Sequence, residues 1–424
     1  MSQLTSRILQ HDASTEIRCS TSNPWSYELL KRATLDQRLP LVLVDLERFD
    51  RNCRDFIQKA KSAGKRIRIA SKSIRVPALI QRVLDHGSAV SGVMCYSVAE
   101  AVFLAELGFD DLLIAYPTTE QAEIALVKQA VQAGKTITLM ADCPEHLAKL
   151  SEAWRFSGGR SPLRICIEID VSWRPWGQHF GSQRSPIRSV LDLKSLLDCL
   201  GNFPNLQMVG AMAYEAHLSG VPDANPFTPV RNLAVRTMRH FASRDVAKKR
   251  QKIHECLRSQ RLELEFFNGG GTGWFEPPLA ESCLTEVTVG SGLLQPHLFD
   301  YYRGQTRLPA FCFALPVTRI SQNDRITCQG GGFIASGPPN PDRPPQPIFP
   351  LGLGVEPQEG FGEVQTPLIV PRSKRGQIKL GDPIFFRPAK AGEIAERFTE
   401  YCLLSQDRIV NQVPTYRGMN QCFH

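Results

Sequence analysis

A lysine stands where an apolar stretch of this sequence ends and a helix is expected to begin. Lys72 follows the segment Ile67–Ala70, and Pro77, a residue favoured in the first turn of a helix, comes soon after it. In a barrel of alternating strands and helices, the carboxyl ends of the strands carry the chemistry. A lysine there, partly shielded from water, can lose its proton and bind a carbonyl group as an imine (Schiff base). The alternative at this position is a surface lysine whose amine extends into water.

Two glycine-rich segments further along the chain are suited to binding a phosphate group. Successive glycines let the backbone approach an anion and direct N–H groups at it, and an adjacent hydroxyl adds a further donor. The candidate phosphate ligands are Gly270, Gly271, Thr272, Gly290 and Ser291. Tight turns are the alternative explanation for such glycines. A phosphate site beside an imine-forming lysine indicates pyridoxal phosphate, whose aldehyde needs the lysine.

Polar residues also follow the other expected strands. They are Tyr96, Tyr116, Asp142, Asp170, Arg174, Tyr214 and His217. Each position alone is weak evidence for an active site, because strands often end in polar residues where the chain reaches the surface. Their agreement around one rim favours an active site there.

The elements that would position these residues alternate regularly between strand and helix. Eight apolar segments read as strands: Ile67–Ala70, Ser91–Cys95, Leu112–Ala115, Thr136–Met140, Leu163–Ile169, Leu206–Ala213, Leu262–Phe267 and Glu286–Val289. Helix starts are indicated by Pro77, Pro144 and Pro186 and by capping boxes at Ser97/Glu100 and Thr118/Gln121. This pattern predicts an α/β fold, a (β/α)8 TIM-type barrel with parallel strands, with an open doubly wound sheet as the alternative.

The two ends of the chain differ in character from the barrel segment. Leu39–Leu46 reads as a ninth strand, and short strands, turns and prolines replace the alternating pattern after Tyr302. We therefore expect residues 1–46 to join a β domain, residues 47–304 to form the barrel that binds pyridoxal phosphate, and residues 305–424 to form a β-rich C-terminal domain. The turn-rich stretch 330–345 is a candidate functional loop.

Composition narrows the classes of protein that remain possible. The chain has 424 residues, 42% of them hydrophobic, which is enough for a large core. Its net charge of +8 reflects in part a basic stretch from Arg236 to Arg261 that includes Arg250, and we interpret that stretch as the solvated face of one amphipathic helix rather than a nucleic-acid site. The twelve cysteines show neither Cys-x-x-Cys nor metal-ligand spacing. With no apparent signal peptide or membrane segment, we expect a cytoplasmic protein with reduced cysteines.

Several of these segments resemble the motifs of a known superfamily. They are Leu43–Leu46, Ser71–Ser73, Tyr214–His217, Gly269–Gly273, Glu286–Ser291, Gly362–Leu368 and Ala389–Glu393. They resemble the fold-type III pyridoxal phosphate enzymes, the superfamily of the alanine racemase N-terminal domain. The resemblance is strongest to the amino acid deaminase/aldolase branch near D-threonine aldolase and D-serine dehydratase, and it extends over nearly the whole chain.

The resemblance implies roles for individual residues. Lys72 would be the imine lysine and the acid/base group for the α-proton, and the phosphate ligands would be Gly270, Gly271, Thr272 and Ser291 with Tyr214 beside them. Arg174 would face the pyridine nitrogen of the cofactor, with an ion pair to Asp170 or Glu168 as the alternative. His217 would be a second acid/base group with a pKa near neutral, or else a packed histidine.

The sequence departs from these relatives at their metal site. D-threonine aldolases and D-serine dehydratases hold a divalent metal with a His-x-Asp or His-x-Cys pair in the C-terminal domain, whereas this chain reads Pro388–Glu393 there, without histidine. His424, at the chain end, is a poor ligand candidate. We therefore expect no metal, and we hypothesise that Lys390 supplies the positive charge instead.

The resemblance implies a lyase that acts on a small β-hydroxy amino acid, of D configuration, by aldol cleavage or by dehydration and deamination through the Lys72 Schiff base. An amino acid racemase or epimerase and a non-catalytic protein that binds pyridoxal phosphate are the alternatives. A sugar-phosphate enzyme that uses Lys72 as a plain Schiff base is a further one. The expected partners are a small-molecule amino acid substrate and a second copy of the chain in a homodimer, with neither nucleic acid nor membrane.

Overall fold

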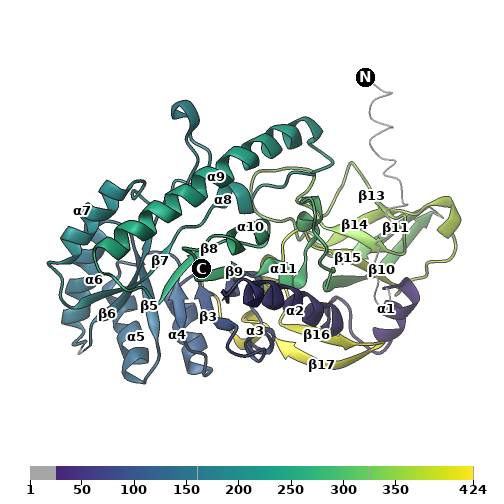
Figure 1. The fold of residues 1–424 in the computed structure, drawn as a ribbon. Helices are drawn as coiled ribbons and strands as arrows, with labels where there is room; N and C mark the ends of the chain where they lie inside the picture. The colour runs from purple at the N-terminus through teal and green to yellow at the C-terminus, as the bar shows by residue number, and fades with distance from the viewer. Residues whose placement is uncertain (1–24, 160, 323, 424) are drawn as a thin grey trace. The chain divides into compact units, whose positions relative to one another are not determined.

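Eight parallel strands close into a barrel in the larger of two units of the chain (Figure 1). The structure, a computed structural model, describes residues 25–159, 161–322 and 324–423. The larger unit comprises Asp50–Leu293, Phe299–Gln305 and the residues from Asn420 to the last described one; the other described residues form the second unit. The barrel strands are β2 (Arg66–Ala70), β3 (Val90–Cys95), β4 (Leu112–Ile114), β5 (Ile137–Ala141), β6 (Leu163–Glu168), β7 (Leu206–Met212), β8 (Phe266–Gly269) and β9 (Glu286–Val289).

Helices alternate with these strands and cover their outer faces, which is why the strands are apolar along nearly their whole length. The helices are α2 (Leu46–Ser62), α3 (Pro77–Leu84), α4 (Val98–Glu106), α5 (Gln121–Gln132), α6 (Pro144–Phe156), α7 (Val190–Leu200), α8 (Ala216–Ser219), α9 (Pro229–Ser259), α10 (Glu276–Leu279) and α11 (Ser291–Leu294). Single 3₁₀ turns are η1 (Ser71–Ser73), η2 (Pro175–Gly177) and η3 (His297–Tyr301). The predicted (β/α)8 barrel is confirmed, and the open sheet is excluded because β2 also pairs with β9.

The interior of the barrel combines an apolar layer with a buried ion pair. Side chains from five strands form one cluster: Leu113, Ala115, Met140, Cys166, Val209, Met212 and Phe266. In the same barrel Arg68 Nε lies 2.7 Å from Glu286 Oε1, and both side chains are almost completely buried. Asn268 Nδ2 also donates to Glu286 Oε1, at 2.9 Å. The carboxylate is therefore satisfied by several donors, as a buried charge requires.

Three local predictions were wrong. The segment 262–265 precedes β8 rather than belonging to it, so Asn268 and Gly269 lie inside the strand. α7 begins at Val190, where Ser189 and Asp192 form a complete capping box, and not at Pro186. α5 begins after Glu120 with no side-chain cap, so Thr118 is not its N-cap. Each error concerns an element boundary, which local propensity specifies poorly.

The basic stretch was only partly interpreted correctly. α9 carries it as predicted, but Arg250 is completely buried, and Arg239 is buried as well. A guanidinium can be buried where carboxylates and carbonyl oxygens converge on it, and the sequence does not show that convergence. α9 is therefore not a uniformly solvated face.

The second unit contains a sheet of nine strands (Figure 1). They are β1 (Leu41–Asp45), β10 (Phe311–Gln322), β11 (Arg325–Gln329), β12 (Gln346–Phe349), β13 (Gly354–Val355), β14 (Gln365–Ile369), β15 (Pro383–Arg387), β16 (Glu400–Ser405) and β17 (Arg408–Pro414). The spatial order of the strands in the sheet is β13-β14-β11-β10-β1-β16-β17, and β15 pairs with both β10 and β12. Short helical segments complete the unit: α1 (Tyr27–Ala33), η4 (Arg372–Lys374), η5 (Glu393–Glu396) and η6 (Arg417–Met419). The mostly β character predicted for the C-terminal part is confirmed.

Strand β1 joins the C-terminal strands although it comes early in the chain. It pairs antiparallel with β10 and parallel with β16, and all five of its residues are buried. The part of the predicted segment 1–46 that precedes residue 25 lies outside the described residues, as do Cys19 and His424.

Three further features of the described residues bear on the sequence predictions. Within the turn-rich stretch 330–345, the ring of Phe333 packs against Phe313 and Phe398, with centroids 5.1 and 5.5 Å apart. Among the helices that the structure describes, none combines the length and the apolar character needed to cross a membrane. The described cysteines are all free thiols, and most are buried.

Candidate functional site

Lys72 lies in the middle of η1, immediately after β2, with its side chain exposed. The two flanking serines fix the turn to its neighbours in the barrel. Ser71 Oγ donates to the carbonyl of Met94 on β3 at 2.9 Å, and Ser291 Oγ donates to Ser73 Oγ at 3.0 Å. The turn is therefore anchored on both sides while the lysine amine remains accessible at the rim.

The glycines after β8 and β9 bring backbone close to backbone. A methyl group at Gly290 would lie 2.9 Å from the carbonyl oxygen of Ala70, so only glycine allows the chain after β9 to approach the end of β2. Gly292 N donates to Thr272 Oγ1 at 3.1 Å, which joins the two glycine segments. Together with Ser291, the residues predicted to bind phosphate thus lie around one part of the rim.

No room for a side chain remains beside Gly271. A methyl group built there would lie 3.1 Å from Ser219 Oγ and 3.2 Å from the ring of Tyr214, which is closer than ordinary van der Waals contact. The predicted neighbour Tyr214 is therefore beside the glycine segment. The environment of its phenol, first by excluding water and then through the charge of Glu215, raises the pKa of Tyr214 to about 12. The phenol is consequently a hydrogen-bond donor at neutral pH.

Gly270 differs from the other predicted phosphate ligands. Its N–H donates to Glu215 Oε2 at 3.1 Å, so this donor is already engaged by a carboxylate. Glu215 is in turn paired with Arg250, and both side chains are completely buried. Arg250 Nη1 also lies 2.7 Å from Glu281 Oε1, and its Nη2 donates to the carbonyl of Ala213 at 2.6 Å. Gly270 therefore serves to fix the loop rather than to offer a free N–H.

His217 is buried in α8, and its Nε2 has no hydrogen-bond partner among the described residues. Burial, and then the charges of Lys249 and Arg250, lower the pKa of His217 to about 4. The imidazole is thus neutral at pH 7, where it can accept a proton but cannot act as an imidazolium donor. The expected pKa near neutral does not agree with this environment.

Arg174 forms an ion pair with Asp170, one of the two partners considered from the sequence. Its Nη2 lies 2.6 Å from Asp170 Oδ2, so the guanidinium is held in an ion pair next to its own strand. Another ion pair, not predicted from the sequence, lies at the same rim. Arg184 Nε lies 2.8 Å from Glu168 Oε1, and Glu168 is buried.

Glu168 points into the mouth of the barrel, because it lies two residues after Cys166, a member of the interior cluster. Asp142 follows Met140 in the same way on the neighbouring strand. Burial raises the pKa of Glu168 to about 7; Arg184 opposes this shift and Asp142 adds to it. A carboxyl group with such a pKa can exchange protons at neutral pH. Its position at the end of a strand was the available sequence signal.

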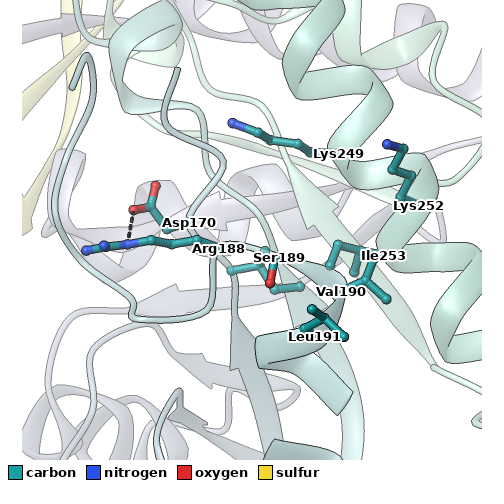
Figure 2. Close-up of a pocket in the computed structure, with 9 residues that line it drawn as sticks. Asp170, Arg188, Ser189, Val190, Leu191, Lys249, Lys252 and Ile253 are labelled. Atoms are coloured by element: carbon teal, nitrogen blue, oxygen red, sulfur yellow. Dashed lines mark ion pairs between the residues drawn. The ribbon is translucent and has the colours of Figure 1, made fainter. Parts of the chain in front are cut away.

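A separate cavity of about 340 Å³ lies on the outer side of the rim, between α7 and α9 (Figure 2). Its lining residues are Ile169, Asp170, Arg188, Ser189, Val190, Leu191, Lys249, Lys252 and Ile253. Arg188 Nε lies 3.7 Å from Asp170 Oδ2, the pair marked in Figure 2. None of the predicted cofactor ligands lines this cavity, so it is distinct from the site at Lys72.

Two groups bear on the expected absence of a metal. In the second unit, Lys390 Nζ lies 2.7 Å from Ser336 Oγ and 3.1 Å from Glu393 Oε1. In the barrel, Asp142, Cys143 and His146 lie together with ligand atoms within 4.8 Å of one another. Cys143 therefore lies beside two other metal-ligating side chains, which the spacing of the cysteines alone did not indicate.

Comparison with known proteins gives the family. The family described as "Alanine racemase, N-terminal domain" matches residues 44–293 of this chain, which span the whole barrel. The chain belongs to this family. The family comprises fold-type III pyridoxal phosphate enzymes, as the motifs around Lys72 and the glycine segments indicated.

Two curated relatives match a little more than half of the chain. The 3-hydroxy-D-aspartate aldolase of Paracoccus denitrificans (strain Pd 1222) is 25% identical over 252 residues, 59% of each chain. The D-threonine aldolase of Arthrobacter sp is 24% identical over 252 residues, 59% of this chain and 60% of the relative. The matched region thus spans about three fifths of the length of these relatives.

Solved structures share the fold over a greater length. The D-threonine aldolase from Filomicrobium marinum has a TM-score of 0.75 at 20% identity, covering 90% of this chain and 96% of the other. The D-threo-3-hydroxyaspartate dehydratase from Delftia sp. HT23 has a TM-score of 0.68 at 16% identity, covering 90% and 98%. At these identities the likeness extends to the fold alone.

Proposed function

We propose that this protein is a pyridoxal phosphate-dependent lyase that acts on a small D-β-hydroxy amino acid, by aldol cleavage or by dehydration and deamination. The observation that carries the proposal is the placement of Lys72, exposed on an anchored turn at the rim of a fold-type III barrel. The named activities of the curated relatives support the substrate class, since both are aldolases for D-amino acids with a β-hydroxyl group.

The residues at the rim fit the cofactor. Glycine at position 271 leaves the backbone without a side chain, which is what a phosphate group approaching backbone N–H groups needs. Gly271, Thr272 and Ser291 would hold the phosphate, with the protonated phenol of Tyr214 as a neighbouring donor. When bound, pyridoxal phosphate would withdraw electrons from the α-carbon of the amino acid.

The chain's own groups would supply the proton transfers. Lys72 Nζ would hold the cofactor aldehyde and then exchange the proton at the α-carbon. Glu168, with a pKa of about 7, would be suited to take the proton of the substrate hydroxyl. Arg174 keeps further N–H donors beside its ion pair with Asp170 and would face the pyridine nitrogen.

The test begins with the cofactor. Borohydride reduction of the purified protein with pyridoxal phosphate should place the label on Lys72, as mapped by mass spectrometry. Lys72→Ala should lose that label, whereas Lys252→Ala, an exposed lysine on α9, should keep it. A label spread over surface lysines, or none, would refute cofactor binding at this site.

The products then separate the reactions. Incubation with D- and L-β-hydroxy amino acids should release an aldehyde with glycine for aldol cleavage, or ammonia with a keto acid for dehydration. A racemase, the second candidate, would instead invert the α-carbon and release neither. A labelled protein that converts no amino acid would favour the non-catalytic alternative.

We propose further that Lys390 provides positive charge for the reaction and that the chain acts as a cytoplasmic homodimer. Lys390→Ala should abolish turnover with the cofactor still bound, whereas Lys379→Ala should leave turnover unchanged. Normal turnover of the Lys390 variant would contradict this role. Light scattering of the purified protein should give twice the mass of one chain, and a monomer would refute the dimer.

A further inference from the structure

Three side chains to which the proposed reaction assigns no proton transfer converge at the end of β5. Asp142 follows the strand, Cys143 is the N-cap of α6, and His146 lies in the first turn of that helix. Their ligand atoms, a carboxylate oxygen, a sulfur and a ring nitrogen, all lie within 4.8 Å of one another. His146 Nδ1 is 2.9 Å from Asp142 Oδ1.

The spacing is close to what a tetrahedral metal ion requires. Zinc binds sulfur at about 2.3 Å and nitrogen or oxygen at about 2.0–2.2 Å, so its ligand atoms are separated by roughly 3.3–3.7 Å. The distance between Asp142 and His146 would open by less than about 1 Å, and the longest separation would close by at most about 1.5 Å. Cys143 and His146 are only half-buried, so their side chains have room to rotate.

An ion pair at the start of α6 would explain Asp142 and His146, and Cys143 is the N-cap of the helix, with its sulfur beside the backbone N–H of His146. Sulfur, imidazole and carboxylate together nevertheless form a ligand set for zinc. Calcium and magnesium prefer oxygen ligands alone, so this set excludes them. Asp142 is 4% exposed, which fixes one ligand firmly in the barrel rim.

We propose that Asp142, Cys143 and His146 bind a zinc ion at the rim of the barrel, with a fourth coordination position open to water. Binding releases the thiol proton to solvent, and the sulfur then coordinates the ion as a thiolate. The site does not include the glycine segments or Lys390. The charge of Asp142 also acts on Glu168, but the zinc content can be measured independently of the lyase reaction.

The test uses the full-length protein, produced without a histidine tag and with its cofactor. The protein is incubated with zinc, desalted, and analysed for metal by mass spectrometry. Cys143→Ser keeps an N-cap hydroxyl for α6, so it removes the ligand while preserving the helix start. His146→Ala removes a second ligand. Cys199→Ser, a half-buried cysteine on α7, is the matched control.

We expect about one zinc ion per chain in the unaltered protein and in Cys199→Ser, and loss of that ion in both ligand variants. Cobalt loading provides a second readout, because the charge-transfer absorption between thiolate and cobalt should disappear in Cys143→Ser. Circular dichroism would establish that each variant is folded. If the unaltered protein retains no zinc, or if Cys143→Ser retains as much as the unaltered protein, the site does not exist.

Discussion

Replacing Arg250 with methionine should destabilise the barrel strongly. Arg250 is fully buried between Glu215 and Glu281, and it also binds the carbonyl of Ala213. Methionine has a similar length and fills the space but leaves Glu215 as a buried carboxylate without its cationic partner. The N–H of Gly270 would be its remaining donor, so the glycine loop should be affected as well.

The expected magnitude follows from the burial of both partners. Removing one member of a buried ion pair costs about 3–5 kcal/mol. For a domain of this size each kcal/mol lowers the melting temperature by roughly 2–4 °C, so we expect a decrease of about 6–20 °C. Arg258→Met, at an exposed arginine on the same helix, should change stability by less than about 0.5 kcal/mol.

Urea denaturation followed by circular dichroism measures these changes. The double variant Glu215→Gln/Arg250→Met removes the unpaired charge, so it should regain part of the lost stability relative to Arg250→Met. A loss below about 1 kcal/mol in Arg250→Met would refute the reasoning, because water or another group would then have to satisfy the carboxylate.

Two further predictions concern the rim. Gly271→Ala should weaken pyridoxal phosphate binding by about 1–3 kcal/mol, because the methyl group would crowd Ser219 and Tyr214. Titration with the cofactor, followed by absorbance, measures the affinity, and Gly354→Ala, where the nearest neighbour of the added methyl group is 3.9 Å away, is the control. Equal affinity for the unaltered protein and both variants would contradict the placement of the phosphate. Glu168 binds a proton more readily in the folded state, where burial raises its pKa to about 7 from 4.5, so its contribution to stability is present below pH 4.5 and is lost as the pH rises to 7. Glu168→Gln should remove that decrease in urea denaturation measured across this range, and an unchanged pH profile would show that the pKa is not raised.

The sequence was sufficient for the repeating architecture and for the position of Lys72. Apolar runs of four to eight residues, separated by capped helices, specify strands buried on both faces, and eight of them close a barrel. The residue after the first barrel strand must then lie at the rim. Glycine runs after the last two strands could likewise be located, because their positions follow from the same order of strands.

Only the tertiary structure decided which polar groups are free and which are paired. Arg250 is indistinguishable from a surface arginine in the sequence, yet it is buried between two carboxylates. For Arg174 the sequence left the partner open between Asp170 and Glu168, and the structure pairs it with Asp170. Glu168 and His217 acquire their altered pKa values from surrounding segments that are distant in the chain. Burial and charge pairing depend on the side chains that distant segments bring into contact with a residue, whereas the periodicity of apolar residues is visible in the local sequence. The fold could therefore be predicted more fully than the electrostatics of the site.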